Sequence, residues 1–207
     1  MRQKIGYILG YYWLWILGIL CGVLLIGYMI CRANFAVKDY WFYGMFANTM
    51  EDGGNGSPLW RDFVAYAGFD ADEKKVEMNA ASYFDPSISG GTNNSYYQAF
   101  VALVESGDLD VVVMGRDSLE AVGRSGRLLD LEDERCASLL EVYRDRLVYC
   151  EPYDEEYSTR PVPVGIDISD SLLAEKYHLY SGDCVLGISA YSNRMESVRL
   201  FLEFVLS

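Results

Sequence analysis

The sequence contains one histidine, His178, in 207 residues. Zinc sites combine several histidines and cysteines, and a serine–histidine–aspartate triad needs a histidine as its base. A triad in this chain would have to use His178, and the scattered cysteines give a single histidine no regular set of zinc ligands. Helical spacing places His178 within a helix, between Tyr177 and Leu179, as a packed or surface residue. The sequence therefore predicts no enzyme activity, no metal and no cofactor, and a hydrolase that uses His178 is kept as an alternative.

Cysteine is too sparse for a disulfide framework. Cys21 and Cys31 fall in or beside the first apolar segment, which leaves Cys136, Cys150 and Cys184 in the rest of the chain. Three is an odd number, so at most one bridge can form among them. The other interpretation is that all three are small, buried apolar thiols.

Basic residues are scarce relative to acidic ones. The whole chain has a formal net charge of −13, and residues 31–207 carry 15 basic and 30 acidic side chains, a net charge of −15. Such a charge repels phosphate backbones and anionic lipid headgroups. We therefore expect no nucleic acid among the partners of this chain.

Charge is absent altogether from residues 5–30, which follow Arg2 and Lys4. A helix of this length would rise about 39 Å, enough to cross a hydrocarbon core of about 30 Å. The segment is long for a cleaved signal peptide. These features predict a cytoplasmic tail at residues 1–4 and an uncleaved transmembrane helix at residues 5–30 in the cell membrane. The acidic remainder is then expected on the extracytoplasmic side.

Four glycines lie on one i, i+4 ladder along this predicted helix, with Leu14 between the two pairs: Gly6, Gly10, Gly18 and Gly22. Small residues allow membrane helices to approach closely. The ladder predicts packing against a second copy or against another membrane subunit. The alternative is that glycine is simply frequent in membrane helices.

The sequence after residue 30 predicts an aromatic and glycine-rich connector at residues 31–58 and a domain at residues 59–207. Alternating or continuous apolar runs predict strands at 76–84, 110–114, 164–168 and 184–189. Capping and amphipathic patterns predict helices at 59–69, 95–105, 117–123, 136–147, 170–177 and 193–205. Strands that alternate with helices are typical of an α/β fold with a mostly parallel sheet flanked by helices.

Two stretches resemble a known family. Residues 95–133, which contain the pattern G-x-L-x-D-L near their end, and residues 187–206, GISAYSNRMESVRLFLEFVL, resemble the N-terminal lobe of bacterial extracellular solute-binding proteins of the periplasmic type 2 class. The resemblance implies the fold of one such lobe. Members of the family hold their ligand between two lobes, whereas this chain has room for one. The resemblance thus implies a sensor or accessory module of a transport or envelope system, and the alternative is a scaffold domain that has lost ligand capture.

Polar side chains follow each predicted strand. In open α/β sheets, ligands bind outside the carboxyl ends of the strands. Hydroxyls, amides and aromatic rings at such places suit a small neutral polar ligand such as a sugar, but the same residue types also serve as helix caps and turns. The candidate ligand-binding residues are Tyr83, Asp85, Asn94, Ser95, Arg116, Asp117, Asp167, Asp170 and Ser171.

Overall fold

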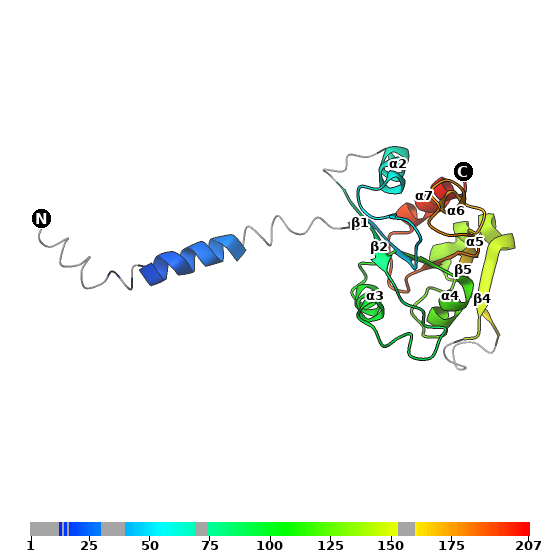
Figure 1. Ribbon diagram of the computed structural model, residues 1–207, viewed down its shortest axis with the longest axis horizontal. Helices are drawn as coiled ribbons and strands as arrows, with labels where there is room; N and C mark the ends of the chain where they lie inside the picture. The colour runs from blue at the N-terminus through cyan, green and yellow to red at the C-terminus, as the bar shows by residue number, and fades with distance from the viewer. Residues whose placement is uncertain (1–12, 14, 16, 30–39, 69–73, 153–159) are drawn as a thin grey trace, which may run out of the picture. The chain divides into compact units, whose positions relative to one another are not determined.

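The computed structural model describes residues 13, 15, 17–29, 40–68, 74–152 and 160–207. The chain divides into two units, Met1–Asp39 and Tyr40–Ser207, which are taken separately below. Figure 1 shows the elements of both.

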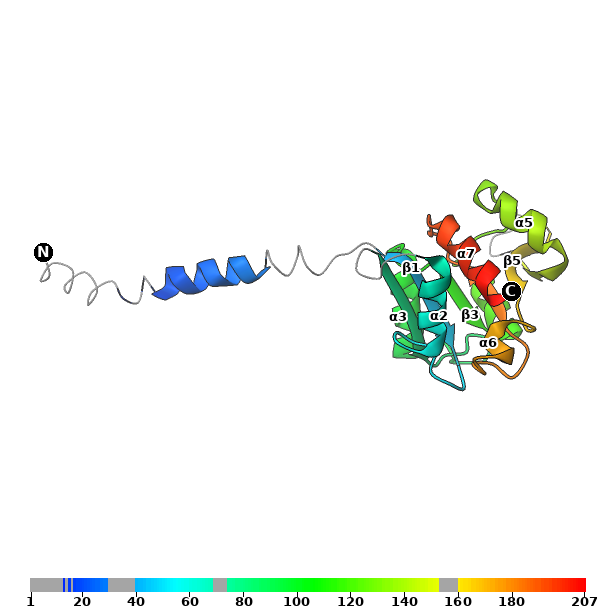
Figure 2. The same cartoon turned by 90° about the horizontal axis from the view of Figure 1, so that it is seen from above.

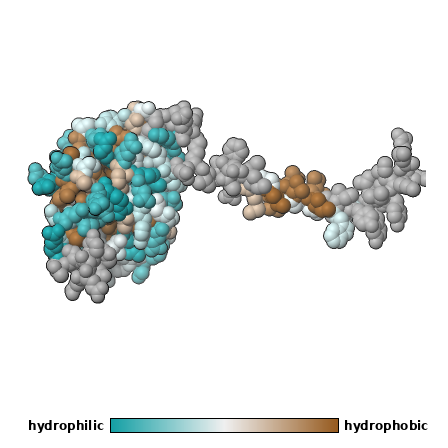
Figure 3. Space-filling model, turned by 180° about the vertical axis from the view of Figure 1, so that it is seen from behind, coloured by the Kyte–Doolittle hydropathy of each residue, from teal (hydrophilic) through white to brown (hydrophobic). Residues whose placement is uncertain are grey.

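The first unit contributes one stretch of helix, whose unbroken described part is residues 17–29. Its large side chains are apolar and exposed, and Figure 3 draws most of them in brown. In the described part of the chain no helix is both long and apolar enough to cross a membrane, so the transmembrane prediction for residues 5–30 is contradicted.

The predicted glycine ladder falls only partly on described residues. A Cβ atom added at Gly18 or Gly22 would meet no other atom within 4 Å. Gly6 and Gly10 lie outside the described residues. Packing of a second helix on this ladder stays a prediction.

The second unit is built on a six-stranded sheet in the order β2-β1-β3-β6-β5-β4. Its strands are β1 (Tyr40–Ala47), β2 (Lys75–Ser82), β3 (Val111–Met114), β4 (Leu147–Cys150), β5 (Val162–Asp167) and β6 (Val185–Ile188). Strand β1 pairs in parallel with β2 and β3. The pairs β3–β6, β6–β5 and β5–β4 are antiparallel.

The sheet is therefore mixed, and the prediction of a mostly parallel sheet was wrong. Parallel neighbours need a crossover connection of a dozen or more residues, usually a helix. Only the four-residue helix α6 (Leu172–Glu175) lies between β5 and β6, and no described helix lies between β4 and β5. The connection between β4 and β5, residues 151–161, is shorter than a crossover needs, whereas residues 168–184 between β5 and β6 are long enough but contain only the single turn of α6. The alternation of strands with helical patterns in the sequence did not reveal this.

Strand β1 was not predicted, because its residues were assigned to the connector at 31–58. The strand has no regular polar alternation, and the six positions from Phe42 to Ala47 are all buried. A continuous apolar run of this kind marks a strand that is covered on both faces. The folded unit thus begins at Tyr40 rather than at residue 59.

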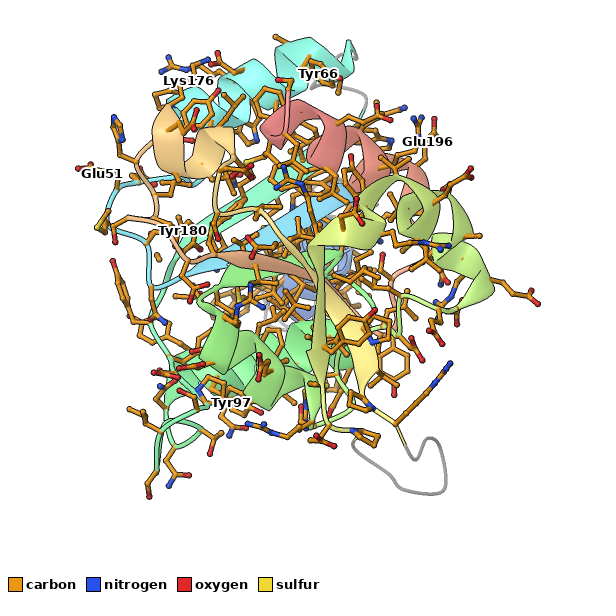
Figure 4. The ribbon with its side chains drawn as sticks, turned by 90° about the vertical axis from the view of Figure 1, so that its right-hand side faces the viewer. Glu51, Tyr66, Tyr97, Lys176, Tyr180 and Glu196 are labelled. Atoms are coloured by element: carbon orange, nitrogen blue, oxygen red, sulfur yellow. The ribbon has the colours of Figure 1, made fainter. Side chains whose placement is uncertain are left out.

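Helices cover both faces of the sheet (Figure 1), and Figure 2 is seen from the side of α2 and α7. One face carries α2 (Pro58–Ala67), α5 (Ala137–Tyr143), α6 and α7 (Met195–Val205), and the other carries α3 (Ser95–Glu105) and α4 (Arg116–Gly123). Short 3₁₀ helices, η1 (Glu134–Cys136) and η2 (Arg144–Arg146), flank α5. In Figure 4, Tyr97 of α3 and Lys176 after α6 lie on opposite sides of the sheet.

Each face has its own buried apolar cluster. Phe42 and Phe46 of β1 pack with Phe63 of α2 and Phe201 of α7, and the ring centroids of the contacting pairs lie 4.9–6.0 Å apart. On the other face, Phe84 stacks on Phe100 of α3 at 5.4 Å. Burying a large apolar side chain contributes about 1.5–3 kcal/mol, so β1, which contributes to both clusters, is central to stability.

Side chains from the loop after β1 and from helix α2 cover the free edge of β2. The Thr49 hydroxyl donates to the Ala80 carbonyl, and the Trp60 indole donates to the Val76 carbonyl. The amide oxygen of Asn55 accepts from the nitrogen of Met78 at 2.8 Å. Unpaired edge strands invite pairing with other chains, and these contacts block that here.

Candidate functional site at the carboxyl edge of the sheet

The carboxyl ends of β1, β2, β3 and β5 meet at one edge of the sheet, together with the amino ends of β4 and β6. The strands that follow β1 in the chain, β2 and β3, lie on its opposite sides. The direction of winding therefore reverses between β1 and β3. Ligands of open α/β sheets bind at such a switch point.

A pocket of about 270 Å³ lies at this point. Its walls are formed by Ala47, Asn48 and Met50 after β1, by Gly115 and Ser118 at the start of α4, and by the segment 179–183 before β6. The pocket is small and partly polar. It suits a small polar solute better than a large apolar one.

The β1 wall is held in place by two side chains. Asn48 has a left-handed backbone with φ of 58°, and its amide both donates to the Phe84 carbonyl and accepts from the Phe84 nitrogen. The buried Tyr180 hydroxyl, on the segment labelled in Figure 4, donates toward the carbonyls of Ala47 and Val113 at 3.1 and 2.9 Å. Burial raises the pKa of Tyr180 well above its ordinary value, so its proton stays in place.

The α4 wall is open toward the pocket. Gly115 caps the helix without a side-chain hydrogen bond, and its φ of −60° and ψ of 152° suit any residue. A Cβ atom at this position would meet no other atom within 4 Å. Neither backbone conformation nor packing requires glycine here, and its absence of a side chain leaves space in front of the first turn of α4.

Asp85 joins the loop after β2 to the same helix. Its Oδ1 atom accepts from the Ser118 hydroxyl at 2.6 Å and from the Ser87 hydroxyl at 2.5 Å. Burial raises the pKa of Asp85, but the hydrogen bonds from Ser118 and Ser87 outweigh it, and the net pKa is lowered. Asp85 is therefore ionised at neutral pH.

Ion pairs connect three charged side chains along the same edge of the sheet. The Arg116 guanidinium pairs with Asp167 at 2.5 Å and with Asp183 at 3.7 Å. Asp167 also accepts from the backbone nitrogen and the hydroxyl of Ser169. Burial raises the pKa of Asp167, but the Ser169 hydrogen bonds and Arg116 together lower it below the ordinary value.

A second, more polar hollow of about 420 Å³ lies beyond β5, between Asp145, Arg146, Asp167, Ser169 and Asp170. Arg146 binds Asp170 through two hydrogen bonds of 2.5 and 2.9 Å. This contact lowers the pKa of Asp170. Both charges are already paired here, so the hollow has less to offer a ligand than the pocket at the switch point.

The structure brings part of the predicted site together. Asp85 is linked to the pocket by its hydrogen bond with the pocket-lining Ser118, and Arg116 and Asp167 form an ion pair beside it. Asp170 lies farther along the edge, bound to Arg146. Asp117 is exposed in the first turn of α4.

The other predicted residues have different roles. Asn94, rather than Ser95, caps α3 through its contact with the Tyr97 nitrogen. Ser95 is exposed in the first turn of that helix. Ser171 is the buried cap residue of α6, and its hydroxyl oxygen has no hydrogen-bond partner within the described structure.

Tyr83 is 55 % exposed and packs against the exposed ring of Tyr96 at 6.1 Å. The two aromatic rings belong to the end of β2 and the start of α3, next to the loop that Asp85 fastens. Neither residue lines the pocket at the switch point.

Sequence reasoning missed Asn48, Tyr180 and Asp183. Asn48 follows β1, which was not predicted, and so could not be placed at a strand end. An asparagine after a continuous apolar run was the available signal, because asparagine tolerates the left-handed conformation. Tyr180 gave no local signal, since its contact with Ala47 joins residues 133 positions apart.

His178 lies outside α6, contrary to the prediction of a mid-helix position. Its φ is 52°, and its Nδ1 atom lies 3.2 Å from the Ala174 carbonyl oxygen. The hydrogen bonds of the described residues show no contact between this ring and a serine hydroxyl. The geometry therefore gives no support to a serine–histidine pair.

The three domain cysteines are free and buried. Burial raises the pKa of Cys136 and Cys150 to about 11 and that of Cys184 to about 12. Thiols with such pKa values carry little thiolate at neutral pH and react slowly. Of the two interpretations, the structure has the buried thiols and not the bridge.

A different polar cluster lies at the amino end of β3. Asp110 has no exposed surface and accepts from the Tyr43 nitrogen, the Ser192 hydroxyl and the Arg194 guanidinium. Arg194 also donates to the carbonyls of Gly107 and Asp108 at the end of α3. These contacts join β1, β3, α3 and α7 and leave no opening for a ligand.

Models of known protein families do not match this chain, and neither curated proteins nor solved structures match it significantly. The assignment of function therefore depends on the site itself.

Proposed function

We propose that the unit Tyr40–Ser207 binds a small, neutral, polar solute in the pocket between β1 and β3, and that it acts as a sensor or accessory module rather than as an enzyme. One observation carries the proposal, which is the position of the pocket. It lies at the switch point of the sheet, lined by strand-end and helix-start residues from three parts of the chain.

The charges around the pocket favour a neutral solute. Arg116 is already engaged by Asp167 and Asp183, so it has little capacity left for an anionic group. Asp183 itself has 64 % of its side chain exposed beside the pocket. A free anion would meet this carboxylate, whereas a hydroxyl can donate a hydrogen bond to it.

The proposed role is weak and reversible binding. The pocket is open on one side, and the described structure has no second lobe that closes over it. Tight capture by closure depends on contacts that differ between an open and a closed state. A module of this kind responds to a solute that is present at high concentration.

A thermal-shift screen of the full chain against monosaccharides, polyols, small amides and inorganic anions tests the proposal. A solute at about 100 times its Kd stabilises the folded state by about 2.7 kcal/mol. For a domain of this size, that raises the Tm by about 5–10 °C. We expect saturable stabilisation by a neutral solute, and the absence of any such solute from a broad panel would contradict the proposal.

The variant Gly115→Leu locates the binding site. The backbone angles at Gly115 allow leucine, and no atom lies within 4 Å of a Cβ added there. The variant should therefore fold, with the leucine side chain filling the pocket. We expect the variant to lose the solute-induced shift in Tm. Gly18→Leu is the matched control, because an added Cβ there also meets no atom. An unchanged shift in Gly115→Leu would place binding elsewhere.

A further inference from the structure

The hydroxyl of Ser118 is the polar side-chain group that α4 presents at the pocket. Ser118 is 7 % exposed and lines the pocket directly. A serine hydroxyl has one hydrogen to donate and lone pairs that accept. The partner that takes this hydrogen therefore determines what Ser118 can offer a ligand.

Asp85 takes the hydrogen. The distance from the Ser118 oxygen to Asp85 Oδ1 is 2.6 Å, and the carboxylate is ionised at neutral pH, so the serine must be the donor. Asp85 Oδ1 also accepts from the Ser87 backbone nitrogen at 3.0 Å and from the Ser87 hydroxyl at 2.5 Å, and these two hydrogen bonds fix the carboxylate in place. Ser118 is left with lone pairs alone facing the pocket.

We infer that Asp85 is a positioning residue that makes Ser118 an obligatory hydrogen-bond acceptor, so that the pocket selects solutes that bring a hydroxyl or amide donor and rejects acceptor-only solutes. The inference rests on the proposed binding of a polar solute at this pocket. It adds that Ser118 accepts the hydrogen bond from the solute and that Asp85 sets this direction.

Asp183 and Asn48 fit the same selection. Asp183 presents an ionisable carboxylate at the pocket, another acceptor. The amide of Asn48 uses its oxygen and one N–H on the Phe84 backbone, which leaves its second N–H as a donor. A polyol matches this arrangement because each of its hydroxyls can both donate and accept. Inorganic sulfate has only acceptors and matches it poorly.

Four variants of the full chain separate the roles, with affinity measured for erythritol, glucose and inorganic sulfate. Ser118→Ala removes the acceptor, and we expect roughly a tenfold loss of affinity for the neutral solute that binds wild type best. Asp85→Ala frees the serine hydrogen to turn into the pocket. We expect it to lower the ratio of neutral-solute to sulfate affinity by about tenfold.

Asp85→Asn is the conservative rescue. Its Oδ1 atom can accept the same three hydrogen bonds, so we expect the wild-type ratio of affinities. Ser87→Ala is the matched control, since it removes another partner of Asp85 without changing a pocket-lining residue. A merely structural role of Asp85 would weaken both classes of solute together and would leave their ratio unchanged.

The outcomes distinguish this inference from the function on which it rests. If no neutral solute binds wild type, the proposed function fails. If wild type binds one but Asp85→Ala keeps the wild-type ratio, the proposed function stands and this inference is overturned. If Asp85→Ala does not fold, Ser118→Ala decides, because unchanged affinity for the neutral solute in that variant also overturns the inference.

Discussion

Aspartate side chains are buried at one end of the sheet and exposed at the other. At the amino end of β3, Asp110 is fully buried and accepts hydrogen bonds from Tyr43, Ser192 and Arg194. At the carboxyl end, Asp183 and Asp170 keep 64 % and 61 % of their side chains exposed. The first arrangement joins elements of the fold, whereas Asp183 lines the open pocket at the switch point and Asp170 lies farther along the same edge.

The comparison shows that buried polar groups hold the fold together, whereas exposed ones can contact a ligand. Removing one partner of a buried ion pair leaves an uncompensated charge and costs about 3–5 kcal/mol, whereas exposed pairs contribute about 0–1 kcal/mol. Substitutions at the amino end should therefore act on stability. Substitutions at the carboxyl end should leave most of the stability intact, and only those of pocket-lining residues should act on binding.

Strand β1 joins the two ends, and its removal should have the largest effect. A chain that lacks residues 1–58 loses β1, which pairs with both β2 and β3 and contributes Phe42 and Phe46 to the core. With about 1.5–3 kcal/mol for each large buried side chain and a typical total of 5–15 kcal/mol, this chain should not fold.

A chain that lacks only residues 1–39 keeps the complete second unit and is the control. We expect it to unfold in urea in one cooperative transition, followed by circular dichroism. Cooperative unfolding of the shorter chain, 59–207, would contradict the central place of β1.

The next largest effect is expected for Asp110→Ala. The substitution leaves Arg194 without its carboxylate partner and the Tyr43 nitrogen without an acceptor, so we expect a loss of about 3–5 kcal/mol of unfolding free energy. Urea denaturation measures this loss. A double-mutant cycle with Arg194→Met separates the pair from the other contacts of each residue. A loss below about 1 kcal/mol would remove the contrast between the two ends.

Asp170→Ala at the carboxyl end should have a much smaller effect. Its pair with Arg146 is well formed but exposed, so we expect a loss of no more than about 1 kcal/mol by the same denaturation measurement. Binding of a solute in the pocket should be unchanged, because Asp170 does not line it. A loss as large as that of Asp110→Ala would contradict the comparison.

The pH dependence of that small contribution has a definite sign. The hydrogen bond from Arg146 lowers the pKa of Asp170, so the folded protein binds fewer protons at this site than the unfolded chain. The contribution is present above the unfolded pKa of about 3.9 and is lost as the pH falls through the lower folded pKa. The difference in unfolding free energy between wild type and Asp170→Asn should therefore shrink in acid. A difference that grows toward low pH would reverse this sign.

Much of the fold could be predicted from local patterns. Runs such as Val111–Met114 and the amphipathic stripe around Phe201 gave β3 and α7 directly. Strand β1 was missed because its aromatic residues follow a long apolar segment and suggest the same apolar environment. Strand β4 was not among the predicted strands. The antiparallel course of β6 could not be inferred, since strand direction depends on three-dimensional connections rather than on the pattern of one strand.

The candidate site divides in the same way. Asp85 and Arg116 follow predicted strands and Asp167 lies near the end of one, which is why the rule about carboxyl ends named them, and their role in binding stays a prediction. Their partners were not predictable, because the bond from Ser118 to Asp85 joins residues 33 positions apart and that from Arg116 to Asp167 joins residues 51 positions apart. Asn94 and Ser171 show the opposite case, in which a polar residue at the expected place is a helix cap.

A titration of the isotope-labelled full chain with the neutral solute that raises the Tm most tests the central claim most directly. Backbone amide chemical shifts report where the solute binds. The account predicts that the largest changes occur at Asn48, Gly115 and Ser118 and that they saturate together. Changes that leave these three amides unaffected and centre on another surface would contradict it.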